Sequence, residues 1–209
     1  DPDHVLMTGN PVRRSVIEGD RARGRKALGV PEDATLLLVF GGSLGAQHLN
    51  ERVASLKNEL LSRKNLYVLH SDGFEETERA LALTPEEAKH YRVQPYIDNM
   101  GDMLAAADLV LSRSGASSVA EIAALAVPSV LVPYPHATAD HQTTNARYLV
   151  DAGAGVLCAD ADIDGSAFAD ELLHLVDDAA ARDAMRQAAR GLAQDRAAAL
   201  LADAVEGLR

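Results

Sequence analysis

Short, continuous runs of apolar residues recur along the chain, and longer amphipathic stretches separate them. Apolar runs without strict alternation are typical of parallel strands that are buried on both faces of a sheet. We expect strands at Thr35–Phe40, Leu66–His70, Tyr91–Gln94, Leu109–Ser112, Ser129–Pro133 and Gly155–Cys158, with His4–Met7 as either a further strand or a linker. The alternation of strands with helical stretches predicts an α/β fold built on a doubly wound parallel sheet.

The stretches between the apolar runs carry a helical pattern. We expect helices at Gly45–Arg63, Phe74–Ala82, Asn99–Ala107, Ser117–Ala126 and Asp140–Ala152. The tail from Ser166 to Leu208 is rich in alanine and charged throughout, which predicts two or three surface helices with breaks near Asp178 and Gly191. A chain of 209 residues accommodates one large domain or two small ones, and it contains no convincing internal linker.

Composition excludes several classes of function. The net charge of −11 disfavours a general binder of nucleic acid or of anionic membranes, because both attract Lys and Arg. Cys158 is the single cysteine, so we expect neither an internal disulfide nor a cysteine cluster for a metal. The absence of a signal peptide and of a long apolar run indicates a cytoplasmic protein. The opening DPDHVLMTGNPVRR lacks an initiating Met and is typical of the middle of a longer protein.

A glycine-rich loop, GGSLGAQHLN, follows the first predicted strand. Gly41, Gly42 and Gly45 allow the backbone to approach a ligand closely, Ser43 offers a hydroxyl, and the next helix would point free N–H groups at an anion. The loop is not a P-loop, and Phe40 stands where a dinucleotide fingerprint needs its first glycine. The alternative is a tight turn that binds nothing.

A second small-residue loop, SRSGASSVAEIAAL, follows the fourth predicted strand. We expect Ser117 or Ser118 to cap the helix, with Glu121 in its first turn. The amides from Ala116 to Ser118 are suited to a phosphate, and Glu121 is suited to a pair of vicinal hydroxyls such as a ribose diol. The alternative is that these residues only begin a helix.

The loop VPYPHATADHQTTN follows the fifth predicted strand. Asp140 is a candidate helix cap, and Gln142 and Asn145 lie three apart on one helix face, where their amides suit sugar hydroxyls. His136 and His141 have no partner cluster that would favour a metal site.

Two further positions have two interpretations each: a role in ligand binding, or a structural role without a ligand contact. Arg13 follows the proline turn of TGNPVRR. Its side chain is either solvated or forms a bidentate contact with a diphosphate. Ile97, in PYIDNM, is either a core residue or a residue whose backbone pairs with a base edge.

Taken together, TGNPVR, FGGSLGAQHLN, YIDNM, SRSGASSVAEIA and PYPHATADHQTTNA resemble the donor half of the MurG family, from about Thr8 to Gly155. These UDP-N-acetylglucosamine transferases make lipid II in peptidoglycan synthesis. The resemblance implies a Rossmann-like domain, one half of a GT-B glycosyltransferase. Residues 1–209 would then be the C-terminal nucleotide-sugar-binding domain, with a linker or first strand at 1–12 and C-terminal helices at 166–209. The N-terminal acceptor domain would be absent.

The resemblance also implies roles for individual residues. Arg13 and Ser43 would contact the diphosphate, and the main chain of Ile97 would hold uracil. Glu121 would take the ribose hydroxyls, and Gln142 would read N-acetylglucosamine with Asn145 nearby. The phosphate-binding helix start would comprise Ala116, Ser117, Ser118, Val119 and Ala120. His141 stands where some members have a second glutamine, and its role is left open.

No metal, cofactor or catalytic residue is implied for this chain, which would be inactive without its other half. The complete protein would be a glycosyltransferase of cell wall biogenesis, peripheral to the cytoplasmic face of the cell membrane. Its partners would be UDP-N-acetylglucosamine and, through the missing domain, the lipid-linked acceptor lipid I. We expect no nucleic acid partner and no direct membrane contact by this domain.

Three alternatives remain. A UDP-sugar epimerase shares the half-fold, but we find no set of acid and base carboxylates for it. The chain could instead be the donor-binding subunit of a split, two-subunit glycosyltransferase. An NAD-binding oxidoreductase domain is disfavoured by Phe40 and by the distance of Asp72 from the end of the second strand.

Overall fold

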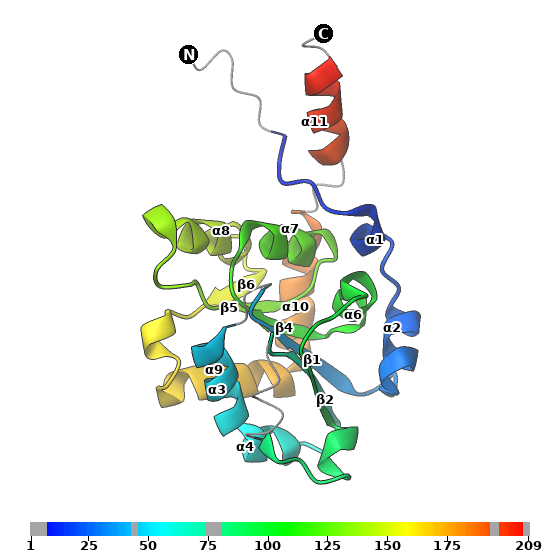
Figure 1. Ribbon diagram of the computed structural model, residues 1–209, viewed down its shortest axis with the longest axis vertical. Helices are drawn as coiled ribbons and strands as arrows, with labels where there is room; N and C mark the ends of the chain where they lie inside the picture. The colour runs from blue at the N-terminus through cyan, green and yellow to red at the C-terminus, as the bar shows by residue number, and fades with distance from the viewer. Residues whose placement is uncertain (1–7, 43–45, 74–80, 193–196, 207–209) are drawn as a thin grey trace.

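The computed structural model describes residues 8–42, 46–73, 81–192 and 197–206. Within these ranges six strands form one sheet in the order β3-β2-β1-β4-β5-β6, and all neighbouring strands run parallel (Figure 1). The strands are β1 (Thr35–Phe40), β2 (Leu66–Ser71), β3 (Tyr91–Gln94), β4 (Leu109–Ser112), β5 (Ser129–Leu131) and β6 (Gly155–Leu157). The predicted doubly wound sheet is therefore confirmed, with differences only at strand ends.

Helices cover both faces of the sheet (Figure 1). They are α1 (Arg14–Ile17), α2 (Arg21–Leu28), α3 (Gln47–Ser55), α4 (Lys57–Leu61), α6 (Met100–Ala106), α7 (Ala116–Ala124), α8 (His141–Val150), α9 (Ser166–Asp177), α10 (Ala179–Arg190) and α11 (Ala197–Glu206). Short 3-10 turns occupy Glu87–Lys89, Thr138–Asp140 and Asp160–Asp162. Residues of α2, α6, α7 and α8 contribute to one buried cluster, and residues of α3, α4 and α9 contribute to another.

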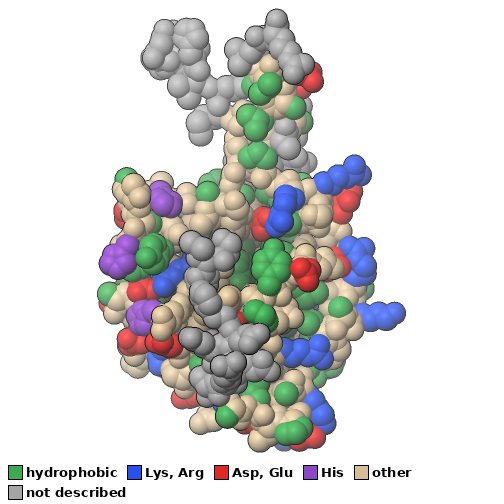
Figure 2. Space-filling model, in the orientation of Figure 1, with side chains coloured by type: hydrophobic (Ala, Val, Ile, Leu, Met, Phe, Trp, Pro, Cys, Tyr) green, Lys and Arg blue, Asp and Glu red, His purple; other side chains and the backbone are tan. Residues whose placement is uncertain are grey.

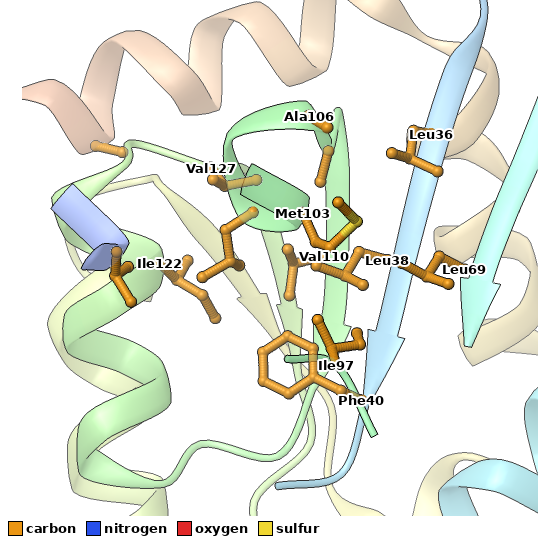
Figure 3. Packing of buried hydrophobic residues seen from close by; sticks show 14 of the residues in the cluster. Leu36, Leu38, Phe40, Leu69, Ile97, Met103, Ala106, Val110, Ile122 and Val127 are labelled. Atoms are coloured by element: carbon orange, nitrogen blue, oxygen red, sulfur yellow. The ribbon is translucent and has the colours of Figure 1, made fainter. Parts of the chain in front are cut away.

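Strand β1 divides its side chains between these two clusters. Leu36, Leu38 and Phe40 belong to the first, which Figure 3 shows from close by, while Leu37 and Val39 belong to the second. All five are at most 5% exposed. Successive side chains of a strand point to opposite faces, so a continuous apolar run buries both.

The helices agree with the sequence prediction only in part. The stretch predicted as one helix from Gly45 to Arg63 is two, α3 and α4, which meet at Leu56. The predicted breaks near Asp178 and Gly191 are confirmed. The expected His4–Met7 element and most of the expected helix at Phe74–Ala82 lie outside the described residues.

Helix α2 was not predicted because its sequence, RARGRKAL, has no apolar periodicity. It begins where the Asp20 side chain accepts a hydrogen bond from the Arg23 amide, and it ends at left-handed Gly29. Ion pairs hold it on the domain: Arg23 contacts Asp102 at 2.7 Å, and buried Arg25 contacts Asp108 at 3.1 Å. Ion pairs therefore add to the apolar contact of Leu28 in attaching this helix to the domain.

Two glycines bring α1 onto α6. A Cβ at Gly101 would lie 2.4 Å from the carbonyl oxygen of Ser15, and a Cβ at Gly19 would lie 2.2 Å from that of Gly101. Only glycine allows backbones this close. The contact fixes the start of α1, which Arg13 directly precedes.

The C-terminal helices divide into packed and projecting elements. Leu172 and Leu175 of α9 and Met185 of α10 are buried against the sheet. Helix α11 projects from the body of the domain (Figure 1). Its Leu200, Leu201 and Val205 are 37–52% exposed, and Figure 2 shows hydrophobic side chains along this helix. No helix within the described ranges has the length and apolarity needed to cross a bilayer.

A buried polar chain links α3, β2 and β3. Asn50 donates from Nδ2 to the carbonyl oxygen of Asp72 at 2.9 Å, so its Oδ1 faces His70 Nε2 at 3.1 Å. His70 Nε2 therefore carries the proton, and Nδ1 accepts from the Tyr91 hydroxyl at 3.0 Å. Burial lowers the pKa of His70 from 6.5 to about 4 and raises that of Tyr91. His70 is held as a neutral hydrogen-bonding side chain.

We predict that His70 makes the domain acid-sensitive. The unfolded chain takes up the proton below its ordinary pKa of 6.5, whereas the folded chain resists it until about pH 4. The stability linked to neutral His70 is complete above about pH 6.5 and falls by about 3 kcal/mol on approach to pH 4.

Urea unfolding of wild type and His70→Gln between pH 4 and 7 measures this effect, with exposed His174→Gln as the control. The wild type should lose more stability than His70→Gln as the pH falls, and His174→Gln should follow the wild type. Parallel curves for wild type and His70→Gln would contradict the prediction.

Candidate functional site

The chain order of the strands reverses between β1 and β4. The chain runs outward from β1 through β2 to β3, then returns to pair β4 with β1 and continues to β5 and β6. In open α/β sheets, ligands bind outside the carboxyl ends of the strands at such a reversal. The loops after β1 and β4 and, one strand further, after β5 follow the strands at this edge.

The loop after β1 is described only in part. Gly42 has a φ of +88°, in the left-handed region, and space for a Cβ is open there. Ser43, predicted to contact a diphosphate, lies outside the described residues. Helix α3 then begins after Ala46 without a side-chain cap.

The loop after β4 ends at an uncapped helix start. The prediction that Ser117 or Ser118 caps α7 is wrong: Gly115 holds the N-cap position and no side chain caps the helix. Both serines lie in the first turn, because the extended backbone of Gly115 lets the helix start at Ala116. Without a cap, the first amides keep their affinity for an anion.

The other predicted members of this helix start differ in exposure. Ala116 is exposed, while Val119 is buried in the core cluster and Ala120 is half-buried. Any contact of a ligand with Val119 would therefore be through its main chain.

Arg13 and Glu121, predicted separately as ligand contacts, pair with each other. Arg13 Nη2 donates to Glu121 Oε1 at 3.0 Å. The Arg13 side chain is 66% exposed and that of Glu121 only 13%. Solvent screens the exposed guanidinium, so Arg13 can exchange partners, whereas the mostly buried Glu121 carboxylate needs another hydrogen-bond donor in place of Arg13. The structure thus brings a cation and a carboxylate together beside the start of α7.

From α8, the Gln142 side chain contacts the loop after β5 and the Asn145 side chain contacts the loop after β4, and these partners fix which way each amide points. The Tyr134 amide can only donate, so at 2.9 Å it identifies Gln142 Oε1 as the bound atom and leaves Nε2 as a donor. The carbonyl oxygen of Ser114 can only accept, so at 3.1 Å it identifies Asn145 Nδ2 and leaves Oδ1 as an acceptor. The helix face presents one donor and one acceptor.

Ser114 joins the two loops. Its hydroxyl donates to the carbonyl oxygen of Gln142 at 2.8 Å, while its own carbonyl accepts from Asn145. Ser114 is fully buried. The β4 loop and the start of α8 therefore form one hydrogen-bonded unit.

The histidines and Asp140 of the β5 loop are exposed. Asp140 holds the N-cap position of α8 as expected, but its carboxylate makes no capping bond to an amide: at φ +52° it accepts from the Thr143 hydroxyl at 2.6 Å. His141 Nδ1 donates to the carbonyl oxygen of Thr138 at 2.8 Å, and His136 lies edge-on to Tyr134. Among the residues described, no group of three or more His, Cys, Asp or Glu side chains is arranged to hold a metal ion.

Ile97 has a buried side chain, 4% exposed, in the same core cluster as Phe40 (Figure 3). The interpretation of the Ile97 side chain as a core residue is therefore correct. A role in binding would rest on the main chain of Ile97, between β3 and α6.

Sequence reasoning missed Arg113, the residue that follows β4. Its side chain is 8% exposed, and Nη1 donates to the carbonyl oxygens of Val132 and Pro133 at 3.3 and 3.1 Å. Nη1 also forms an ion pair with Asp160 Oδ1 at 2.5 Å. The available signal was an arginine between two serines at the end of a buried strand.

The Asp160 carboxylate extends this contact to α3. His48 Nδ1 lies 2.9 Å from Asp160 Oδ2, and His48 Nε2 lies 3.2 Å from Asp164. These two carboxylates raise the pKa of His48, Asp160 foremost. Burial opposes ionisation of Asp160, but hydrogen bonds from His48 and Arg113 lower its pKa.

Comparison with known families identifies the class of protein. The model of the glycosyltransferase family 28 C-terminal domain matches residues 36–203, and the chain belongs to this family. Its fold class, a Rossmann-like half of a GT-B glycosyltransferase, agrees with that membership.

Individual relatives give a more specific comparison than the family match. The chain is 38% identical over 210 residues to a protein of Desulforudis audaxviator, covering 98% of this chain and 56% of that protein. It is 42% identical over 202 residues to one of Chlorobium phaeobacteroides, covering 96% and 54%. Both are named UDP-N-acetylglucosamine–N-acetylmuramyl-(pentapeptide) pyrophosphoryl-undecaprenol N-acetylglucosamine transferase. The chain thus spans a little over half the length of these relatives.

Solved structures agree. MurG of Acinetobacter baumannii superposes with a TM-score of 0.71 at 27% identity, covering 97% of this chain and 58% of that one. A putative UDP-N-acetylglucosamine 2-epimerase from Listeria monocytogenes has a TM-score of 0.68 at 18% identity, covering 99% and 54%. That second likeness concerns the fold alone, so the epimerase alternative gains no support beyond a shared architecture.

We predict that Ser114→Ala destabilises the domain by about 0.5–1.5 kcal/mol, because it removes the hydrogen bond from the buried Ser114 hydroxyl to the carbonyl of Gln142 that joins the two loops. Ser62→Ala is the control, since Ser62 donates to the Glu59 carbonyl at 2.7 Å in an exposed position. Urea unfolding should show a change within about 0.5 kcal/mol for the control. Equal effects of the two substitutions would show that Ser114 does not tie the loops together.

Proposed function

We propose that this chain is the donor-binding domain of a transferase that moves N-acetylglucosamine from UDP-N-acetylglucosamine to lipid I, which makes lipid II. The observation that carries the proposal is the pairing of Arg13 with Glu121 beside the uncapped start of α7. The names of the relatives support the donor, the acceptor class and the reaction.

The site offers complementary groups for each part of the donor. The amides at Ala116 to Ser118 and the exposed Arg13 suit the diphosphate, as Ser43 does by resemblance. Glu121, released from Arg13, accepts hydrogen bonds from the ribose hydroxyls, and the main chain at Ile97 takes the uracil edge. The diphosphate is bound without a metal held by the protein.

The sugar would lie against α8. Gln142 Nε2 donates to an oxygen substituent of the sugar ring, and Asn145 Oδ1 accepts from a sugar hydroxyl. A wall with one fixed donor and one fixed acceptor discriminates between sugar epimers, because the wrong epimer leaves a group unpaired.

The acceptor site and the group that takes the acceptor proton belong to a part of the protein outside this chain. Exposed Leu200, Leu201 and Val205 on projecting α11 support a contact between that helix and the other half. In the complete protein, that half would bring the donor site to the lipid-linked acceptor at the cytoplasmic face of the membrane.

We predict that Glu121→Ala weakens UDP binding by about 1.5–3 kcal/mol, the contribution of hydrogen bonds to a charged group. Glu18→Ala is the control, since Glu18 accepts from Arg14 at 2.7 Å in an Arg–Glu pair whose two side chains are both exposed. Calorimetry should show unchanged UDP affinity in the control. Unchanged affinity in folded Glu121→Ala would refute the ribose assignment.

A separate prediction concerns the sugar. Gln142→Ala should weaken UDP-N-acetylglucosamine more than UDP, because it removes a donor that only the sugar meets. Gln187→Ala on α10, whose amide contacts Arg190 on the surface, serves as the control. Titration of both ligands into each variant measures the ratio of affinities. If Gln142→Ala weakens both ligands equally, Gln142 contacts the nucleotide or only supports the fold.

A further inference from the structure

Arg113 and Asp160 form a buried ion pair near Gln142, the residue that we propose to contact the sugar. Their side chains are 8% and 13% exposed. Arg113 follows β4, and Asp160 begins the 3-10 turn after β6. We propose that this pair is a positioning device that holds Gln142 in the orientation that reads the sugar; the inference rests on the proposed function.

The path from the pair to the sugar is short. Arg113 Nη1 donates to the carbonyl oxygens of Val132 and Pro133, and the next amide, that of Tyr134, donates to Gln142 Oε1 at 2.9 Å. A displacement of Pro133 therefore moves the amide that orients Gln142. The Arg113 guanidinium also lies 5.9 Å from the centre of the Tyr134 ring.

The Asp160 charge is required because carbonyl oxygens alone do not balance a buried guanidinium. The pair joins the loops after β4, β5 and β6, and His48 extends the contact to α3, the helix that follows the glycine-rich loop. Arg113 and Asp160 act through Tyr134 and Gln142, so both are positioning residues without a proposed contact to the donor.

The chain contains a matched pair at the other end of the sheet. Arg25 and Asp108 form an ion pair at 3.1 Å with side chains 1% and 14% exposed, and Asp108 directly precedes β4. Asp108→Asn therefore makes the same chemical change in a similarly buried carboxylate, far along the strand from the proposed site.

The test measures the affinities of the complete protein for UDP-N-acetylglucosamine and for UDP, together with the melting temperature. Asp160→Asn should lower the affinity for the nucleotide sugar about tenfold relative to UDP, the scale expected when one hydrogen bond to the sugar is lost. Asp108→Asn should lower the melting temperature but leave the ratio of the two affinities unchanged. Asp160→Glu, which keeps the charge, should restore most of the ratio.

An unchanged ratio in Asp160→Asn, or an equal loss of ratio in Asp108→Asn, would overturn the positioning role. If Asp160→Asn does not fold, Arg113→Lys replaces it: a retained ratio there would overturn the role, and a loss would support it. Failure of the wild type to bind either ligand would instead refute the proposed function, and this inference with it.

Discussion

The pairing of β1 with β4 is the contact on which the site depends. The registers Leu37 to Leu109 and Phe40 to Ser112 end both strands at the same level. Burial of β1 on both faces holds this register, because a slip by one residue would exchange the side chains of the two cores. The loops after β1 and β4 are therefore placed at one edge by packing that lies entirely beneath them.

The polar groups above that edge are arranged by a second principle: side chains of neighbouring elements donate to carbonyl oxygens of the loops and of the start of α8. Ser114 donates to the carbonyl oxygen of Gln142, and Asn145 donates to that of Ser114. Arg113 donates to the carbonyl oxygens of Val132 and Pro133. Because these donors come from neighbouring loops, satisfying the backbone also fixes the loops relative to one another. The same bonds leave Gln142 Nε2 as a hydrogen-bond donor and Asn145 Oδ1 as an acceptor, and both are suited to bind groups of a sugar.

Much of the sheet was predictable because continuous apolar runs, such as TLLLVF at β1, have few alternatives to a buried strand. Helix α2 was not, since ion pairs and its caps at Asp20 and Gly29 hold it in place of an apolar stripe. The cap of α7 was misplaced because the serines suggested a cap where Gly115 provides the turn. Side-chain chemistry identified Arg13, Glu121 and Gln142 as candidates, but their mutual geometry depends on long-range packing. Arg113 was missed because burial, which gives it its role, is invisible in a local pattern.

The central claim is that this edge of the sheet binds a nucleotide sugar. The most direct test is calorimetry of this chain with UDP-N-acetylglucosamine, UDP and NAD side by side. We expect UDP and UDP-N-acetylglucosamine to bind one-to-one and to compete with each other, and NAD to show no binding. Binding of NAD, or binding of neither uridine ligand by the folded chain, would contradict the account.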